Sequence, residues 1–168
     1  MDFFHIAAGP TTYLILGEEV PRRDQLPWGD EECDGFIAIL DPKRVTEPLA
    51  ERVYLGLLAL QIDWIEAMGE GSELLHDRID RKSVAIGRQS RVGDGRPMTA
   101  WHEDFCDIEA MADYVKLGGQ GASENKLVLV VGPEHSASLF ADRLRDALSK
   151  SFLGYPGNGV PNGPRGTQ

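Results

Sequence analysis

The chain of 168 residues contains only two cysteines, Cys33 and Cys106, and no long apolar run. Two cysteines exclude a disulfide scaffold, and no further ligand pair beside them suggests a zinc site. No segment approaches the roughly 18 apolar residues that a membrane-spanning helix needs. The N-terminal MDFFHIAAG lacks the basic and apolar regions of a signal peptide. We therefore expect a reduced, cytoplasmic protein that does not enter a membrane.

Basic residues are also scarce: 17 stand against 27 acidic residues, which gives a net charge of −10. Binding to nucleic acid requires clustered Lys and Arg, so this balance argues against a nucleic-acid partner. Acidic charge keeps many proteins dispersed in solution, and it also speeds encounter with a basic protein partner. The motifs GxGxxG after a strand, GxxxxGK[ST] and GxSxG are absent, so the chain lacks the usual sequence signals of a phosphate-binding loop or a serine hydrolase.

Short apolar runs alternate with amphipathic segments along most of the chain. The runs predicted as strands are GFIAILD, IDWIEAMG, PMTAWHE and KLVLVVG. The residues predicted to cap the helices that follow are Thr46, Ser72, Asp107 and Ser136. This alternation predicts a small, doubly wound, mostly parallel α/β sandwich of the flavodoxin-like or Rossmann-like kind.

The chain is expected to form one α/β domain over residues 1–151, with edge strands and an acidic loop in residues 1–34. Ser83–Gly87 is compatible either with a short strand or with the end of a helix. Residues 152–168 contain five Gly and three Pro, a composition that cannot support a packed element. A flexible tail is expected there.

Acidic and imidazole side chains follow the predicted strands. In an open parallel sheet, ligands bind beyond the carboxyl ends of the strands, where His102, Glu103 and Asp104 are expected. The other side chains expected at this edge are Asp41, Glu66, Glu134 and His135. Such a rim could bind a divalent metal or perform acid–base chemistry, which predicts a metal-assisted hydrolase or transferase, or a ligand-binding domain. The alternative is a purely structural role, in which these residues only cap the helices that follow.

The segment MTAWHED, followed by a helix rich in Ala and aromatic residues, resembles an uncharacterised family of small bacterial α/β proteins. That family carries a Met-Thr-x-Trp-His-Glu-Asp motif at a strand-to-helix junction, here matched by Met98, Thr99, Trp101 and His102–Asp104. The resemblance covers about half of the chain. It implies a compact α/β fold and a bacterial, cytosolic origin, and it implies no activity.

The acidic loop from Asp24 to Asp34 points to a second kind of function. An aromatic anchor within an acidic patch is typical of a protein that docks onto a basic partner. The residues expected to contact such a partner are Trp28, Asp30, Glu31, Glu32, Asp34 and Trp101. Because no complete catalytic set is evident, the sequence favours a non-catalytic binding protein of this kind, similar in role to an immunity protein, an antitoxin or an accessory subunit, without a cofactor.

Overall fold

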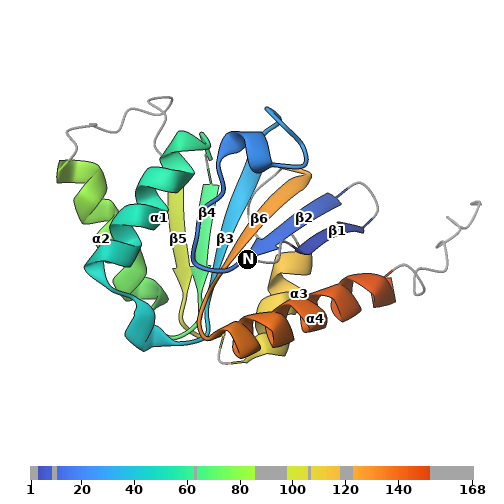
Figure 1. Cartoon of the computed structure of the whole chain (residues 1–168). Helices are drawn as coiled ribbons and strands as arrows, with labels where there is room; N and C mark the ends of the chain where they lie inside the picture. Colours follow the sequence, from blue (N-terminus) through green and yellow to red (C-terminus); the bar gives the residue numbers. More distant parts are fainter. Residues whose placement is uncertain are drawn as a thin grey trace, which may run out of the picture.

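A six-stranded sheet lies between two pairs of helices in the computed structural model (Figure 1). The structure describes residues 4–8, 11–62, 64–85, 98–105, 107–117 and 123–151. The strands are β1 (Phe4–Ala8), β2 (Thr11–Leu16), β3 (Cys33–Ile39), β4 (Trp64–Met68), β5 (Met98–His102) and β6 (Asn125–Val131). The helices are α1 (Glu47–Ala59), α2 (Ser72–Ala85), α3 (Ile108–Leu117) and α4 (Glu134–Ser151), with short 3-10 helices η1 (Arg23–Gln25) and η2 (Pro42–Arg44). The predicted doubly wound α/β fold is confirmed.

The order of the strands is β1-β2-β6-β3-β4-β5. β1 pairs antiparallel with β2, and every other pairing is parallel. β6 is the last of these strands in the sequence, yet it lies between β2 and β3. β3 leads into α1 on one face of the sheet, whereas its neighbour β6 leads into α4 on the opposite face (Figure 1). The carboxyl ends of these two strands therefore form the topological switch point of the sheet.

Two separate cores fill the space between the layers. On one face, Ile37 and Leu129 of the sheet pack with residues of α1 and α2. On the other, Phe36 and Val128 pack with residues of α3 and α4. Because successive strand residues point to opposite faces, the uninterrupted apolar runs of β3 and β6 contribute to both cores.

Two of the four predicted helix caps, Thr46 and Asp107, are present, whereas Ser72 is not a cap because α2 begins at Ser72 itself. The Thr46 hydroxyl accepts from the Leu49 amide, 3.3 Å away, and the Asp107 carboxylate accepts from the Ala110 amide, 2.7 Å away. The prediction that Ser136 caps the last helix is wrong, because α4 begins at Glu134, directly after Pro133. Pro133 occupies the cap position instead, since its carbonyl oxygen accepts from the Ala137 amide, 3.0 Å away.

Other boundaries shift by small amounts. α2 begins at Ser72 itself and continues through Ala85, so the described part of Ser83–Gly87 is helical. The predicted flexible tail and Cys106 lie outside the described residues. Of the helices that the structure describes, none combines the length and apolar character that crossing a membrane requires.

The connection from β2 to β3 contains η1 but no α-helix in a stretch that the structure describes throughout. It crosses the sheet on the side of α1 (Figure 1). Gly56 of α1 permits a close approach, because a Cβ atom there would lie 2.5 Å from the Cβ of Val20. Trp28 turns inward and packs against the core beneath α1. The close contact between Gly56 and Val20 holds the start of the connection, Gly17–Val20, against α1.

Candidate functional site

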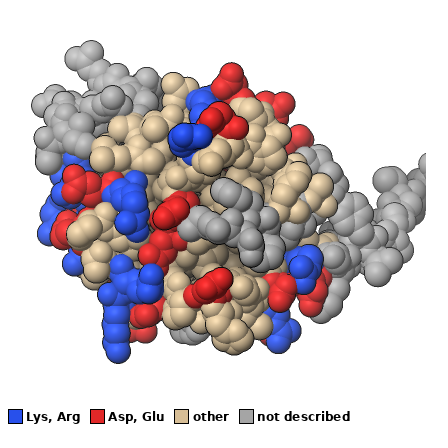
Figure 2. Space-filling view, in the orientation of Figure 1, with Lys and Arg blue, Asp and Glu red and all other residues tan. Residues whose placement is uncertain are grey.

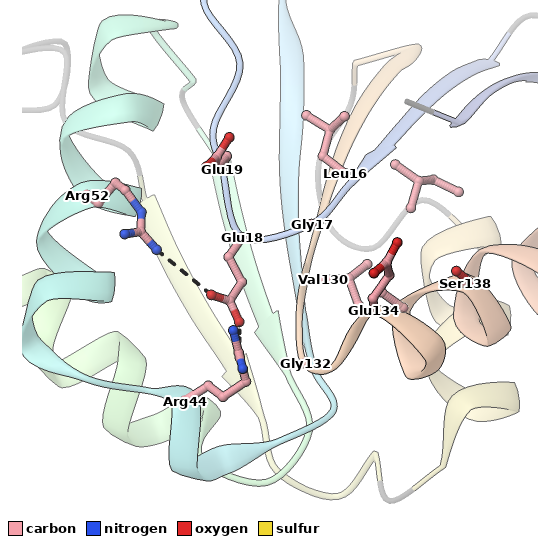
Figure 3. A pocket seen from close by; sticks show the side chains of 12 residues that line it. Leu16, Gly17, Glu18, Glu19, Arg44, Arg52, Val130, Gly132, Glu134 and Ser138 are labelled. Atoms are coloured by element: carbon pink, nitrogen blue, oxygen red, sulfur yellow. Dashed lines mark hydrogen bonds and ion pairs between the residues drawn. The ribbon is translucent and has the colours of Figure 1, made fainter. Parts of the chain in front are cut away.

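A cavity of about 490 Å³ opens at the carboxyl ends of β2 and β6 (Figure 3). We call it the strand-end crevice. Its residues are Ile15, Leu16, Gly17, Glu18, Glu19, Arg44, Arg52, Val130, Gly132, Glu134, Ala137 and Ser138. It lies beside the switch point, on the β2 side of β6, and open α/β sheets bind their ligands at the carboxyl ends of the strands near such a point. Its volume lies within the range of small-molecule sites, roughly 300–1,000 Å³.

Two guanidinium groups form one wall of the crevice. Arg44, from η2, donates a hydrogen bond from Nε to Oε1 of Glu18, and Arg52 of α1 places Nη2 3.9 Å from Oε2 of the same carboxylate (Figure 3). The Glu18 side chain is 19% exposed, whereas the two arginine side chains are 46% and 52% exposed. The hydrogen bond from Arg44 to Glu18 raises the pKa of the Arg44 guanidinium, which stays positively charged. This wall therefore carries two positive charges, and both arginines are paired with the Glu18 carboxylate.

The opposite wall comes from the first turns of α4. Glu134 and Ser138 lie there, across from the arginines in Figure 3. Glu19 also lines the crevice, and its side chain is exposed. The floor between the walls is apolar and contains Leu16 and Val130. The crevice thus combines a cationic side, an apolar floor and an anionic rim.

A second polar cluster lies on the face of the sheet that α3 and α4 cover, beneath α3. Glu66 of β4 is completely buried; one of its carboxylate oxygens accepts from Trp64 Nε1 at 2.6 Å, and the other from the Tyr114 hydroxyl. His102 Nε2 lies 2.9 Å from the Tyr114 oxygen and 3.2 Å from Glu66 Oε2. Since the Tyr114 hydroxyl donates to Glu66, its oxygen accepts from His102, which places the ring proton on Nε2.

Packing encloses this cluster. The ring of Phe105 contacts both His102 and Tyr114, with centroid distances of 5.6 and 4.7 Å. Burial, followed by the hydrogen bond to Glu66 and its negative charge, raises the pKa of Tyr114. A neutral phenol held against a buried carboxylate joins β4, β5 and α3, so we interpret this cluster as structural.

The predicted rim around His102 is only partly assembled. Glu66 does not lie at a strand end, because β4 continues to Met68 and directs the carboxylate under α3. Asp41 caps η2 by accepting from the Lys43 amide at 3.1 Å. Glu103 accepts from the Gly71 amide at 3.3 Å, and His135 is exposed in the first turn of α4. The contacts of His102 involve neither Asp41 nor His135.

A metal site is not formed within the described ranges, since no three His, Cys, Asp or Glu side chains converge there. The proposed ligands His102, Glu103 and Asp104 are therefore not gathered around one point. A wider groove of about 870 Å³ lies between α3 and α4 and includes Glu103 among its lining residues. Arg143 is the single basic residue among its lining residues, which include four acidic ones, whereas two arginines line the strand-end crevice. This groove is consequently a weaker candidate than the strand-end crevice.

The acidic loop is partly turned inward. Asp34 is buried, 2.6 Å from the ammonium group of Lys126, so its predicted role as a surface contact is wrong. Asp30 pairs with Arg23 at 2.6 Å, and Glu31 accepts from the Asn125 side chain at 3.1 Å. At the top of Figure 2, acidic and basic side chains are accordingly mixed.

Two aromatic residues were also expected to contact a partner. Trp28 covers the core, as described above. Trp101 is 43% exposed and lies on the side of α2, where its ring centroid is 4.2 Å from that of His76. Only Trp101 is therefore substantially accessible.

Sequence reasoning missed the residues that form the cationic wall. Arg44 and Arg52 are distant from Glu18 in the sequence, and their meeting depends on where β2 lies beside β6. Tyr114 was also missed, although a signal existed: Trp64 and Glu66 are two residues apart in a strand and therefore share a face. A carboxylate on that buried face requires hydrogen-bond donors from the covering helix.

No protein-family model, no curated protein sequence and no solved structure matches this chain. The resemblance to small bacterial α/β proteins with the Met-Thr-x-Trp-His-Glu-Asp motif stays a prediction.

Proposed function

We propose that this protein is a small-molecule binding domain whose ligand lies in the strand-end crevice with an anionic group against Arg44 and Arg52. The observation that carries this proposal is the placement of two guanidinium groups on one wall of a cavity of about 490 Å³ at the carboxyl ends of β2 and β6. Guanidinium groups bind carboxylates and phosphates through charge-assisted hydrogen bonds. The apolar floor would receive the body of the ligand.

The test is titration of the full chain with sodium hexanoate and, separately, with inorganic phosphate, followed by NMR. Binding in the crevice is expected to shift the amide signals of Gly17 and Gly132. Replacing both arginines, Arg44→Gln with Arg52→Gln, should weaken binding of the active probe by at least about tenfold.

The matched control is Arg143→Gln, because Arg143 is as exposed as Arg52 and also pairs with a carboxylate, but lines a different groove. This control should bind the probe as the unmodified chain does. Failure of both probes to bind, or equal binding by the double variant, would overturn the proposal.

A second candidate function is recognition of a basic protein partner in the cytoplasm. It is favoured by the consecutive carboxylates of Asp30, Glu31 and Glu32, which remain exposed after the ion pairs of the loop are counted. Substituting all three with Lys should slow association with a partner captured from the native host, most strongly at low ionic strength. An unchanged association rate would exclude this role for the three residues.

A further inference from the structure

Glu18 occupies the place where the proposed ligand's anionic group would lie. Its carboxylate presents one oxygen to Arg44 and the other to Arg52, the arrangement that a bound carboxylate would adopt (Figure 3). We infer that Glu18 is an internal stand-in for the ligand, and that the ligand is a small monocarboxylate whose carboxylate displaces that of Glu18. This inference rests on the proposed function.

The surroundings of Glu18 permit the exchange. Both arginine side chains are about half exposed, so a competing anion can reach them without opening a core. Exposed ion pairs contribute little free energy, because water solvates the separated charges well. Glu18 belongs to a connecting segment rather than to a helix or strand, so moving its side chain breaks no ladder hydrogen bond.

The charges around the crevice limit the ligand to a single negative group. Glu19 and Glu134 line the same cavity and would repel a second anionic group once Glu18 has moved. The floor of Leu16 and Val130, flanked by Ala137, instead suits an aliphatic body. A monocarboxylate with an apolar chain satisfies the cationic wall and the floor, and it places no second negative charge near Glu134.

Hexanoate and adipate test the charge requirement, because the two probes have chains of equal length and differ by one terminal carboxylate. Hexanoate should bind the full chain more tightly than adipate, and hexan-1-ol, which has no anionic group, should bind weakest. Equal or tighter binding of adipate would overturn the assignment of a monocarboxylate.

Glu18→Gln tests the displacement. Glutamine has nearly the same size but does not compete as an anion, so the affinity for hexanoate should rise by about fivefold, the scale of one exposed ion pair. Glu19→Gln is the matched control: it removes a carboxylate from the same cavity without freeing an arginine, and it should change the affinity by less than about twofold. Glu18→Ala should behave as Glu18→Gln does, which guards against an effect of the amide group.

The outcomes separate the two proposals. Equal gains in the Glu18 and Glu19 variants would show general repulsion and overturn the displacement. An unchanged or lower affinity in both Glu18 variants would also overturn it, while the proposed function would stand if the double arginine variant still lost binding. Absence of hexanoate and phosphate binding in every variant would reject the proposed function itself.

Discussion

Glu18 and Glu66 are both carboxylates held by side chains from neighbouring elements, but they lie in opposite kinds of surroundings. Glu66 is fully buried and accepts hydrogen bonds from donors that packing fixes in place. Glu18 contacts two half-exposed arginines beside an open cavity. The first carboxylate cannot be exchanged without disturbing the core, whereas the second can. We therefore interpret the dense cluster around Glu66 as structural, and the crevice beside Glu18 is the site that we propose for binding.

The largest difference should appear on removal of the buried carboxylate. Glu66→Ala leaves the donors of Trp64 and Tyr114 without their shared acceptor, and should lower the free energy of unfolding by about 3–5 kcal/mol. Denaturation in urea measures this loss. Glu66→Gln, which keeps an acceptor oxygen, should lose less; a loss below about 1 kcal/mol in the alanine variant would contradict the structural role of the cluster.

Removal of one donor should have a smaller effect. Tyr114→Phe deletes the hydroxyl between Glu66 and His102 while keeping the ring against Phe105. We expect the free energy of unfolding to fall by about 1–3 kcal/mol, the cost of leaving a buried acceptor short of a partner. Tyr13→Phe is a useful comparison by the same urea assay, because the Tyr13 hydroxyl interacts with Thr11 and, at the long distance of 3.5 Å, with the Lys116 carbonyl oxygen, but with no buried carboxylate among these partners. Equal losses in both variants would mean that the hydrogen bonds of the Glu66 cluster do not stabilise the fold more than the contacts of Tyr13 do.

Alkaline pH should affect the buried cluster and leave the crevice unaffected. The raised pKa of Tyr114 means that its stabilising contribution is complete below about pH 10 and is lost as pH rises toward the folded-state pKa. Burial also raises the pKa of the Cys33 thiol to about 11, so some loss begins near pH 9. Denaturation from pH 8 to 11 should therefore show falling stability. Tyr114→Phe should flatten the part above pH 10, and an identical pH profile would contradict the assignment.

The smallest effect on stability is expected at the crevice. Glu18→Ala removes a partly buried carboxylate but leaves its two half-exposed arginine partners accessible to water, so the free energy of unfolding should change by less than about 1 kcal/mol. Thermal and urea denaturation measure the change. A loss as large as that of Glu66→Ala would show that Glu18 supports the fold and would remove the contrast between the two carboxylates.

The fold class could be predicted because each strand and helix carries its own local pattern. Continuous apolar runs produced β3 and β6, and Thr46 and Asp107 cap the helices as expected. The order of the strands has no comparable local signal. The position of β6 between β2 and β3 brings Glu18 to the arginines, so the crevice could not be found without the topology.

The polar rim predicted around His102 is only partly assembled, and the reason is again a long-range one. Strand position correctly placed the residue at the end of β5, but the direction of its side chain depends on which face α3 covers. Glu66 was expected at the edge formed by the strand ends, but it lies two residues before the end of β4, on the face of the sheet that α3 covers. Asp34 looked like part of an exposed acidic loop, yet it is the second residue of β3 and lies opposite Lys126, and that pairing is long-range.

The central place of β6 has a consequence for how the chain matures. Without β6, the hairpin β1-β2 and the block β3-β4-β5 share no strand pairing, because β6 alone joins them. On a ribosome, the sheet can close only after residue 131 has been synthesised and released, so the apolar edges of β2 and β3 stay uncovered until then. Nascent chains arrested before Asn125 should accordingly recruit chaperones more strongly than chains arrested after α4.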